Sequence, residues 1–365
     1  MQGLKNFLWF LYKCFAFYTV IVYALILWIP SDGWLAGFMM MSFPAVIIVH
    51  ILSVLIWFVI DRKKALLPIT LLALGGIFAS RTFSINRKPN TSATADHSFS
   101  VLSYNTRVFM KNSDQREPTV KEDIASMKVW VRDLGADIIC MPEYYEDETR
   151  LFNINETLRS GGYKYSVKYS EEIRKGRNYY TGLALFSKYP IINARDTIFQ
   201  AQNGLVQADI EIKNDTVRMI GVHLYSMTLN LSKLAHEKEM EGIRAEGKTT
   251  FKRMKTGFMQ RSKQLQVLES WIAESPYPVI ICGDFNEVPY GYVYGRLRKS
   301  MRNGFEEKGE GFGFTFNHIP YFIRIDHQFY KSDQLNMLDF KTLNQVKYSD
   351  HYPIMGIYQI QKTNQ

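Results

Sequence analysis

Residues 278–286, Pro-Val-Ile-Ile-Cys-Gly-Asp-Phe-Asn, join an apolar run to two polar side chains, Asp284 and Asn286. An apolar run of this length is typical of a strand covered on both faces. Because side chains alternate along a strand, Asp284 and Asn286 are predicted to point to the same side at its end. A carboxylate and a carboxamide held together suit the binding of a phosphate, a metal ion or a water molecule. The alternative is a strand that ends in an Asx-type turn, where both residue types are common.

The same pattern, an apolar run that leads to a polar residue, recurs along the chain. The polar residues are Asn105, Glu143, His223 and Asp326, and Tyr348-Ser349-Asp350-His351 precedes the last apolar run. Each of these residues alone is more often a capped or solvated group than a catalytic one. Loops at one edge of a two-sheet scaffold can bring such residues together in one cleft, so the whole set predicts a composite site.

In this order, the residues resemble the endonuclease/exonuclease/phosphatase superfamily, the metal-dependent phosphodiesterases related to DNase I, exonuclease III and neutral sphingomyelinases. Gly283-Asp284-Phe285-Asn286 and Ser349-Asp350-His351 are the specific parts of the resemblance, which covers roughly residues 98–361. It implies an α/β fold, a four-layer α/β sandwich of two packed, mainly antiparallel sheets flanked by helices. It also implies a magnesium-dependent hydrolase that acts on phosphoric ester bonds.

A phosphodiester is anionic and repels hydroxide, so a hydrolase must neutralise charge, supply a nucleophile and protonate the leaving oxygen. Hard oxygen ligands suit magnesium, with manganese as the alternative ion. The resemblance implies that Glu143 is the principal metal ligand. It places Asn105 and Asp350 close to the ion.

The resemblance assigns the remaining residues to the proton transfers and the phosphate. His351 resembles the family's general base or phosphate-contacting histidine, and Asp326 would accept a hydrogen bond from its ring. Asp284 would orient or deprotonate the attacking water, and Asn286 would donate hydrogen bonds to the phosphoryl oxygens. His223 would stabilise the transition state or help the leaving group depart. Family members differ in which group is the base, so that role stays open here.

Positioning these residues requires strands before most of them. Strand-like runs are found at Phe99–Tyr104, Asp137–Met141, Tyr163–Tyr169, Leu183–Ser187, Val206–Ile212, Val217–His223, Val279–Gly283, Ile325–Tyr330 and Pro353–Gln359. An amphipathic helix is predicted at Thr119–Leu134, and a longer, broken helical region at Leu229–Ser275. Many strands with few intervening helices favour two packed sheets with helices outside.

The segment Gly247–Lys263 has six basic residues and no acidic one, and Phe251, Met254 and Phe258 share helical spacing in it. One interpretation is a solvated surface helix. The other is a flap over the site that touches anionic lipid or a polyanionic substrate.

Three apolar runs precede the strands: Phe7–Ile29, Trp34–Ile60 and the shorter Ala65–Ser80. About twenty apolar residues cross a bilayer as a helix. The first two runs meet this length, and the third does so if it extends to Phe83. A cleaved signal peptide would not have a second full span behind it. The sequence therefore predicts an integral membrane protein with three spans, or with two as the alternative.

Basic residues beside the runs predict the orientation. Lys5 precedes the first span and Arg62-Lys63-Lys64 follows the second, whereas Ser31-Asp32-Gly33 between them has no basic residue. This pattern places the N-terminus in the cytoplasm, so three spans would put the large domain on the exocytoplasmic side and two would leave it in the cytoplasm. The basic residues at positions 81–88 argue weakly the other way.

The net charge of +9 is no strong sign of a nucleic-acid protein, because residues 1–88 carry +6 of it beside the predicted spans. The rest of the chain has 36 basic against 33 acidic residues. The three cysteines, Cys14, Cys140 and Cys282, predict free thiols, and no His/Cys spacing resembles a zinc site.

The predicted organisation is a membrane anchor at 1–83, a linker at 84–97 and a catalytic domain at 98–361. The expected function is a membrane-anchored phosphoesterase acting on a phosphodiester or phosphate ester, with a lipid head group as the favoured substrate. A nuclease acting on DNA or RNA is the alternative enzyme, and a catalytically silent membrane-tethered binding protein is the alternative of another class. The lipid bilayer is the expected partner, and no protein partner is evident.

Overall fold

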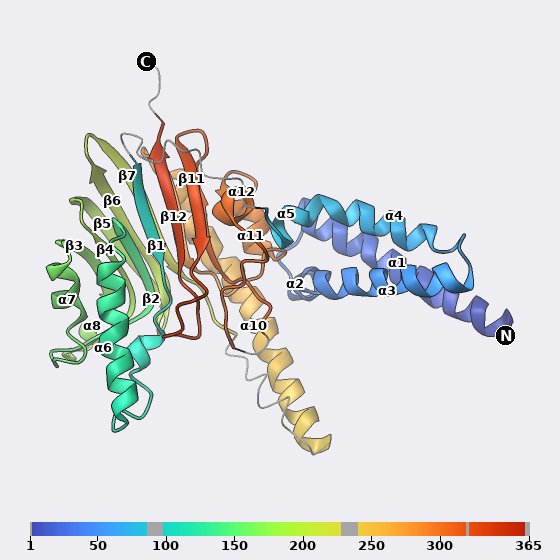
Figure 1. Cartoon of the computed structure of the whole chain (residues 1–365), viewed down its shortest axis with the longest axis horizontal. Helices are drawn as coiled ribbons and strands as arrows, with labels where there is room; N and C mark the ends of the chain where they lie inside the picture. The colour runs from blue at the N-terminus through green and yellow to red at the C-terminus, as the bar shows by residue number, and fades with distance from the viewer. Residues whose placement is uncertain (1, 86–97, 228–239, 319–320, 362–365) are drawn as a thin grey trace.

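The computed structural model describes residues 2–85, 98–227, 240–318 and 321–361. It contains a bundle of apolar helices at residues 2–82, here called the N-terminal helices, and two sheets with flanking helices at 98–361, here called the sheet domain (Figure 1). The predicted linker 84–97 lies outside the described residues, apart from its first two positions. Ser84, one of these two, pairs its backbone with Gly311 of the sheet domain.

Each of the two sheets has six strands, in the orders β11-β12-β1-β2-β4-β3 and β5-β6-β7-β8-β10-β9. The first sheet contains β1 (Ser98–Ser103), β2 (Ile138–Glu146), β3 (Tyr165–Ser170), β4 (Tyr180–Ser187), β11 (Leu335–Thr342) and β12 (Ile354–Ile360). The second contains β5 (Ile191–Gln200), β6 (Asn203–Ile212), β7 (Asp215–His223), β8 (Val279–Asp284), β9 (Arg302–Asn303) and β10 (Asp326–Tyr330). Among these strands β1–β2 and β7–β8 pair in parallel and the others antiparallel.

Strand β8 shows why the central strands are apolar on both faces. Its residues are all buried. Ile280 and Cys282 point into the core between the two sheets, while Val279 and Ile281 face the helices that cover the second sheet. An uninterrupted apolar run is the pattern expected of a strand in this position.

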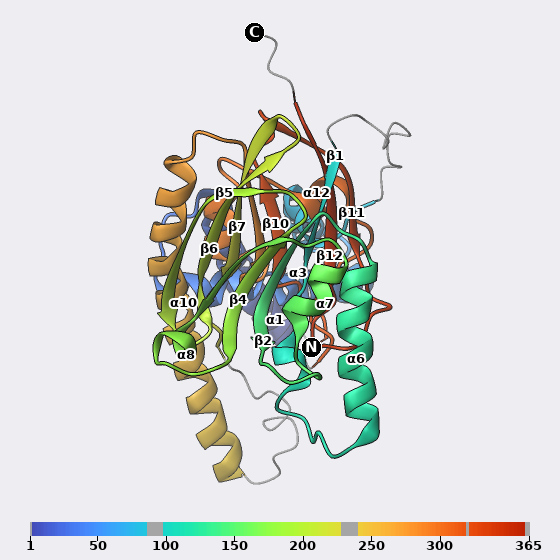
Figure 2. The ribbon, with the colours of Figure 1, turned by 90° about the vertical axis from the view of Figure 1, so that its left-hand side faces the viewer.

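Helices cover the outer face of each sheet, so the domain has four layers (Figure 2). α6 (Pro118–Asp133) and α7 (Ile154–Ser160) pack on the first sheet. α10 (Met240–Ala273) and α11 (Tyr292–Leu297) pack on the second. The shorter helices are η2 (Arg107–Met110), α8 (Glu171–Arg174) and α12 (Gly304–Lys308). The predicted α/β sandwich of two mainly antiparallel sheets with helices outside is confirmed.

Three strands and one helix differ from the sequence prediction. Strands β5, β9 and β11 were not predicted, because β5 is a half-exposed edge strand without an apolar run and β11 contains a bulge between Met337 and Asp339. The prediction that Leu229–Ser275 is broken is wrong for 240–273, which form one helix, and residues 228–239 lie outside the described part. Gly257 does not interrupt α10, since it is where the helix approaches Met227, whose Cγ would lie 2.6 Å from an added Cβ.

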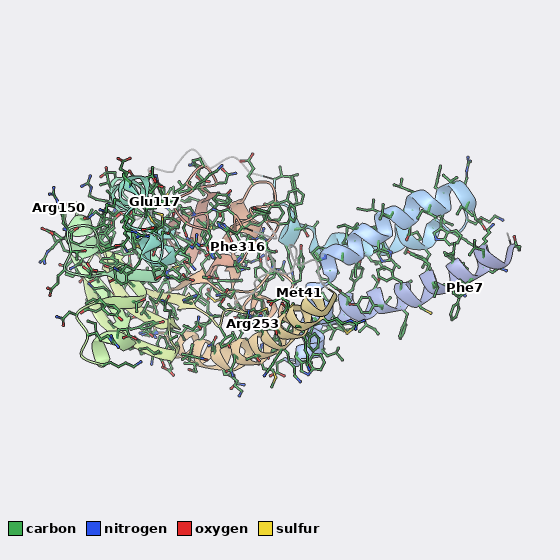
Figure 3. The ribbon with its side chains drawn as sticks, turned by 90° about the horizontal axis from the view of Figure 1, so that it is seen from below. Phe7, Met41, Glu117, Arg150, Arg253 and Phe316 are labelled. Carbon is green, nitrogen blue, oxygen red and sulfur yellow. The ribbon has the colours of Figure 1, made fainter. Side chains whose placement is uncertain are left out.

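The N-terminal helices are α1 (Gln2–Trp28), α2 (Trp34–Met41), α3 (Phe43–Ile60), α4 (Leu66–Gly75), η1 (Gly76–Phe78) and α5 (Ala79–Thr82). By length and composition α1 and α3 can cross a membrane, and Leu66–Thr82 is a shorter apolar helix. Most of their surface is not covered by protein: the side chains of Phe17 and Val59, for example, are 70% and 86% exposed. Phe7 likewise projects from α1 away from the bundle (Figure 3).

The second apolar run, predicted as one span at Trp34–Ile60, is two helices that meet at Ser42. Pro44 lies in the first turn of α3, where its missing N–H leaves no hydrogen bond unmade, and a helix running through it would be disrupted. The helix of this run that is long and apolar enough to cross a membrane is therefore α3 alone, and α2 is a separate short helix. The ring of Phe38 in α2 stacks on the ring of Phe251 in α10, with centroids 4.9 Å apart.

The contact of Phe251 and Phe258 with Phe38 changes how the basic segment Gly247–Lys263 is understood. Its apolar side packs against α2, and the exposed side carries Lys248, Lys252 and other basic residues. The segment is therefore not a helix solvated on every side, and its contact with anionic lipid remains a prediction.

Further contacts join the N-terminal helices to the sheet domain beside the edge where the predicted site residues lie. The Phe43 and Tyr290 rings lie 4.5 Å apart, and the Tyr290 hydroxyl is hydrogen-bonded to that of Thr82 at 2.7 Å. The buried guanidinium of Arg324 donates to the carbonyl of Arg81. These contacts place the apolar helices directly against the site.

Candidate active site

Strand register brings three of the predicted residues into one row. Asp284 of β8 pairs in parallel register with His223 of β7 and in antiparallel register with Asp326 of β10. The Nε2 atom of His223 lies 3.9 Å from Oδ2 of Asp284. Because all three side chains leave the same edge of the second sheet, the polar residues that follow separate apolar runs meet in space.

Gly283 lets β7 and β8 approach closely before Asp284. A Cβ atom at Gly283, whose φ is +143°, would lie 2.0 Å from the carbonyl oxygen of Val222. Beyond Asp284 the chain turns, and the N–H of Asn286 donates to Oδ1 of Asp284 at 2.8 Å. This is the Asx-type turn that was the alternative interpretation. Asn286 has φ +50° and its amide donates to the carbonyl of Leu224 at 3.0 Å, so it faces the cavity from a turn and not from the strand.

Glu143 comes from the first sheet, at an irregularity in β2 between Met141 and Tyr144. Its backbone has φ +50°, an uncommon conformation for a glutamate, and such bulges often redirect a side chain beside an active site. The Thr106 hydroxyl donates to the Glu143 carbonyl at 2.8 Å and so holds this conformation. The Glu143 side chain is 30% exposed, which makes it the most accessible carboxylate facing His223, at 3.9 Å.

Asn105 connects the two sheets at the centre of the site. Its buried amide nitrogen donates to Oδ2 of Asp284 at 3.0 Å and to Oε1 of Glu143 at 3.3 Å. Its side-chain oxygen, Oδ1, accepts a hydrogen bond from the backbone N–H of Arg107 at 3.1 Å. In this arrangement Asn105 holds two carboxylates together, and the role of its oxygen as a metal ligand remains a prediction.

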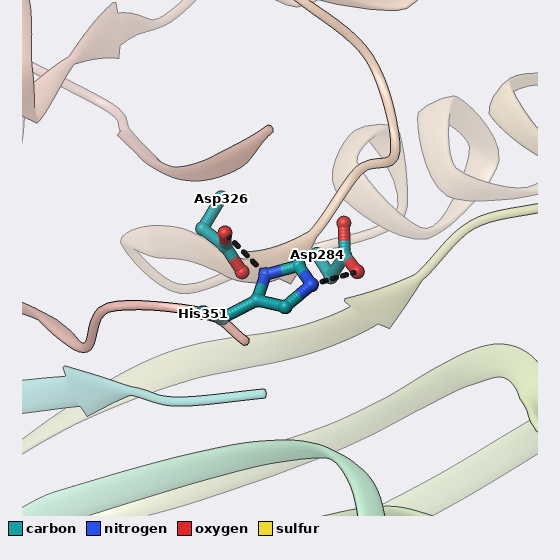
Figure 4. A group of neighbouring side chains, drawn as sticks. All are labelled: Asp284, Asp326 and His351. Atoms are coloured by element: carbon teal, nitrogen blue, oxygen red, sulfur yellow. Dashed lines mark hydrogen bonds and ion pairs between the residues drawn. The ribbon is translucent and has the colours of Figure 1, made fainter. Parts of the chain in front are cut away.

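His351, just before β12, is oriented by Asp326 (Figure 4). Its Nδ1 lies 2.8 Å from Oδ2 of Asp326, and its Nε2 lies 3.9 Å from Oδ2 of Asp284. Burial by itself lowers the pKa of His351, but the carboxylates of Asp326, Asp284 and Asp350 overcome burial and raise that pKa to about 10. The imidazole is therefore held as a cation with Nε2 facing the cavity.

For Asp284, burial determines the direction of the pKa shift and the neighbouring histidines oppose it. Burial, followed by repulsion from Asp326, raises the pKa of the Asp284 carboxyl to about 6, although His351 and His223 act against this rise. A carboxylate with such a pKa is ionised at neutral pH and is a better proton acceptor than an ordinary aspartate. His223 is held from behind, its Nδ1 lying 3.0 Å from the carbonyl of Gln202.

Asp350 lies at the rim, where its carboxylate is 3.5 Å from Nε of Arg107. The preceding residue, Ser349, is buried and donates to the Asn105 carbonyl at 2.8 Å, which fastens the segment before β12 to the end of β1. The structure thus brings all eight predicted residues to one region. Thr106, Arg107 and Gln202 were not predicted, because they act through backbone atoms or lie beside predicted residues without a pattern of their own.

The acidic groups suit a divalent cation by their chemistry. Asp284, Asp326 and His351 offer ligand atoms within 4.8 Å of one another, but the hydrogen bond between Nδ1 of His351 and Oδ2 of Asp326 already uses one of these atoms from each residue. Glu143, Asp284 and Asp350 line one cavity, and Glu143 is the most accessible of them. Hard carboxylate oxygens in this number fit magnesium or manganese better than a soft metal.

His327, next to Asp326, gives a testable effect on stability. Burial, with the nearby charge of Arg324, lowers the pKa of His327 to about 3. In the unfolded chain this histidine has its ordinary pKa near 6.5, so it takes up a proton at higher pH than in the folded state. The contribution of His327 to the free energy of unfolding is therefore complete above pH 6.5 and is lost as the pH falls towards 3. Between pH 7.5 and pH 5 the loss is about 2 kcal/mol for this group. We expect His327→Gln to lose that much less stability than the parent over this interval, measured by denaturant unfolding of the full chain. Equal losses would contradict the assignment.

Comparison with known proteins gives matches to both parts of the chain. A family model described as "Endonuclease/Exonuclease/phosphatase family" matches residues 102–351, and one described as "Domain of unknown function (DUF8431)" matches residues 5–82. No curated protein gave a significant match. Among solved structures, D. rerio TDP2 complexed with a single-strand DNA product is 15% identical, with a TM-score of 0.51, and covers 72% of this chain and 100% of its own. An endonuclease/exonuclease/phosphatase family protein from Bacteroides thetaiotaomicron is 16% identical, with a TM-score of 0.50, 72% of this chain and 98% of its own covered.

These structures share the fold with the sheet domain, at an identity too low to carry substrate or activity across. The family match itself extends from β1 to the segment before β12, so it includes both edges of the site, from Asn105 to His351. The expectation stated from the motifs is therefore confirmed at the level of the family: the chain belongs to the endonuclease/exonuclease/phosphatase family, whose members hydrolyse phosphoester bonds.

Proposed function

We propose that the chain is a membrane-anchored, metal-dependent phosphoesterase that hydrolyses a phosphodiester or phosphate ester bond, with a lipid head group as the favoured substrate class. The observation that carries this proposal is a single cavity lined by Glu143, Asp284 and His351 and also by Met41 and Pro44 of the N-terminal helices. A phosphoester that enters this cavity meets catalytic carboxylates and apolar helices at once. In this proposal residues 1–83 are the membrane anchor and 98–361 the catalytic domain.

Magnesium, or manganese in its place, is the proposed cofactor, with Glu143 as the principal ligand and Asp350 and Asn105 beside it. When bound, such an ion neutralises charge on the phosphate and polarises the phosphorus–oxygen bond. Asn105 is hydrogen-bonded to Glu143, and Glu143 and Asp350 line the same cavity. Hard oxygen donors support this choice of ion.

The protein's own groups move the protons. Asp284 accepts a proton from the attacking water, whose oxygen forms the new bond to phosphorus while the bond to the leaving oxygen breaks. His351, fixed by Asp326, donates from Nε2 to a phosphoryl oxygen, and the amide of Asn286 donates to another. His223 presents Nε2 to the leaving oxygen and protonates it; among the described residues this buried atom has no hydrogen-bond partner. It is therefore available to a substrate.

The proposed orientation places the catalytic domain on the exocytoplasmic side. α1, α3 and Leu66–Thr82 lie side by side, with the 61–65 turn at the end away from the sheet domain (Figure 1). At that far end Lys5 forms an ion pair with Asp61 at 3.1 Å, and Lys64 lies 3.7 Å from the same carboxylate. Basic residues gather on the cytoplasmic side of membrane proteins, so three crossings put the catalytic domain outside.

The first test is hydrolysis of bis(p-nitrophenyl) phosphate, phospholipid vesicles and plasmid DNA by the full chain in lipid nanodiscs with magnesium. We expect turnover of the phosphodiester and of phospholipid. Metal-dependent nicking of DNA with salt-sensitive affinity, and no phospholipid turnover, would favour the nuclease. Turnover of none of the three would favour the silent binding protein. With intact spheroplasts, an activity on the impermeant phosphodiester equal to that of lysed ones supports the exocytoplasmic side, and activity only after lysis contradicts it.

A further inference from the structure

The cavity that contains the active-site residues has a volume of about 680 Å³, a size typical of a ligand pocket, and extends well beyond them. Glu143, Asp284, Asp350 and His351 lie at its polar end. The remainder, here called the apolar groove, is lined by Met41, Pro44, Met254, Phe258, Phe312, Phe314 and Phe322. None of the roles assigned to the site residues uses this larger part of the cavity.

One wall of the apolar groove is built jointly by the anchor and the catalytic domain. Phe258 of α10 lies against α2 so closely that a Cβ atom at Gly37 would be 2.6 Å from its ring. Phe38 packs edge-on against the same ring, with centroids 5.1 Å apart. Figure 3 shows this junction, where α2 and α10 converge beside the labelled residues Met41 and Arg253. The groove therefore opens where the protein meets the proposed bilayer.

The other wall contains two groups of aromatic contacts, one at Phe312 and Phe314 and the other at the catalytic histidine. Phe83, where the anchor ends, packs edge-on against Phe312 at 5.2 Å, and Phe312 stacks on Phe314 at 5.3 Å. Deeper in the same cavity, Phe316 packs edge-on against the ring of His351, with centroids 5.2 Å apart. An apolar surface thus extends from the membrane end of the cavity to the site where a phosphate would lie.

The charges around the cavity do not suit a polyanion. Three arginines border it, and each is buried with its own partner. Arg261 forms an ion pair with Glu287 at 3.0 Å, Arg324 donates to the carbonyls of Phe312 and Arg81, and Arg81 donates to the carbonyl of Pro289. Nucleic-acid binding depends on exposed cations that face the phosphates, whereas these guanidinium groups are buried and bonded to other protein groups. Of their fully buried nitrogen atoms, only Nη2 of Arg261 and Nε of Arg324 lack a hydrogen-bond partner among the described residues. The apolar lining favours hydrocarbon.

We propose that the apolar groove binds the hydrocarbon chain of an amphiphilic phosphoester, whose phosphate lies between Glu143 and His351. This inference rests on the proposed function and adds the way in which the substrate is selected. The hydrocarbon chain enters from the bilayer between α2 and the phenylalanines of the other wall. Phe322, whose side chain is 73% exposed, lies at this entrance. A short-chain or chainless phosphodiester fills only the polar end and is a poor substrate.

The test uses alkyl p-nitrophenyl phosphates from methyl to octyl, each below its critical micelle concentration, with the full chain in nanodiscs. Burial of a methylene contributes about 0.8 kcal/mol, which corresponds to about fourfold in kcat/KM for each methylene that the groove covers. We expect an octyl-to-methyl ratio of at least about tenfold for the parent protein. In Phe314→Ser, and in Phe322→Ser at a more exposed position, the ratio should fall to about twofold. Ile192→Ser, an exposed position on β5 outside the cavity, should keep the parent ratio.

Because each ratio is taken within one variant, a change in absolute rate or in folded fraction cancels. The longer esters partition more strongly into the nanodisc, but they do so equally for the parent and its variants, so this effect cancels when their ratios are compared. A parent ratio near one, or the same ratio in parent and groove variants, overturns the apolar groove as a chain site while leaving phosphoester hydrolysis intact. Absence of turnover for the whole series, including the methyl ester, instead removes the proposed function.

Discussion

Replacing His351 by glutamine lowers kcat on bis(p-nitrophenyl) phosphate about 10²- to 10³-fold, the range for removing one hydrogen-bond donor directed at charge that develops in the transition state. The imidazole is buried, and its Nδ1 is bonded to Asp326 so that Nε2 can face only the cavity. Glutamine keeps an N–H donor for the Asp326 carboxylate, which would otherwise be a buried charge without a partner. The loss in kcat is measured for the full chain in nanodiscs with magnesium, at a temperature where the unfolding curve of each variant shows it to be folded.

Two further variants separate the chemistry of His351 from its packing. Asp326→Asn leaves the ring in place but removes the charge that raises the pKa of His351. The imidazolium should then lose its proton at lower pH, so the alkaline limb of the kcat–pH profile should move to lower pH. His318→Gln, an exposed histidine outside the cavity, serves as the matched control and should retain activity. A His351→Gln enzyme with more than a tenth of the parent kcat would contradict the role given to this residue.

The sequence predicts this part of the site well because the apolar run before each polar residue is a local pattern. His223, Asp284 and Asp326 each follow a buried apolar run, and adjacent strands that end at one edge must bring their next residues together. Gly283 belongs to the family motif, and the structure gives the physical reason, since the close approach of β7 and β8 leaves no room for a side chain. The family motifs then order these residues along the chain, and the structure places them in one region.

The junction between the N-terminal helices and the sheet domain could not be predicted in the same way. Phe38 and Phe251 are far apart in the sequence, and nothing in the local pattern of either helix indicates that their rings stack. The break at Ser42 was missed because Trp34–Ile60 is apolar on both sides of it, and only Pro44 indicates the boundary. The orientation of the Asn105 amide depends on a hydrogen-bond network that includes residues from both sheets. Such features arise from tertiary packing and are absent from any single segment.

Replacing Glu143 by glutamine should abolish metal activation and lower turnover at least about 10²-fold. The loss of a residue that only supports a metal ligand costs up to about that much, and the loss of the ligand itself should cost more. Glutamine is nearly isosteric and keeps the φ of +50° that turns the side chain to the cavity, so the change removes one negative charge without moving the backbone. In the parent, magnesium at about a hundred times its dissociation constant should stabilise the folded state by about 2.7 kcal/mol. In Glu143→Gln that stabilisation should disappear, and it is measured by denaturant unfolding with and without the ion.

This readout is independent of turnover, so it separates two explanations that an activity assay cannot distinguish. If Glu143 holds the ion, the variant loses both the magnesium-dependent stabilisation and the activity. If Glu143 serves only to hold Asn105 through the 3.3 Å hydrogen bond, the activity falls while magnesium still stabilises the protein. Glu148→Gln is the matched control, since this exposed glutamate lies five positions further along the chain and outside the cavity. Persistent magnesium stabilisation in Glu143→Gln would move the ion to Asp284 and Asp350, which also line the cavity, because the remaining lining carboxylate, Glu287, is paired with Arg261.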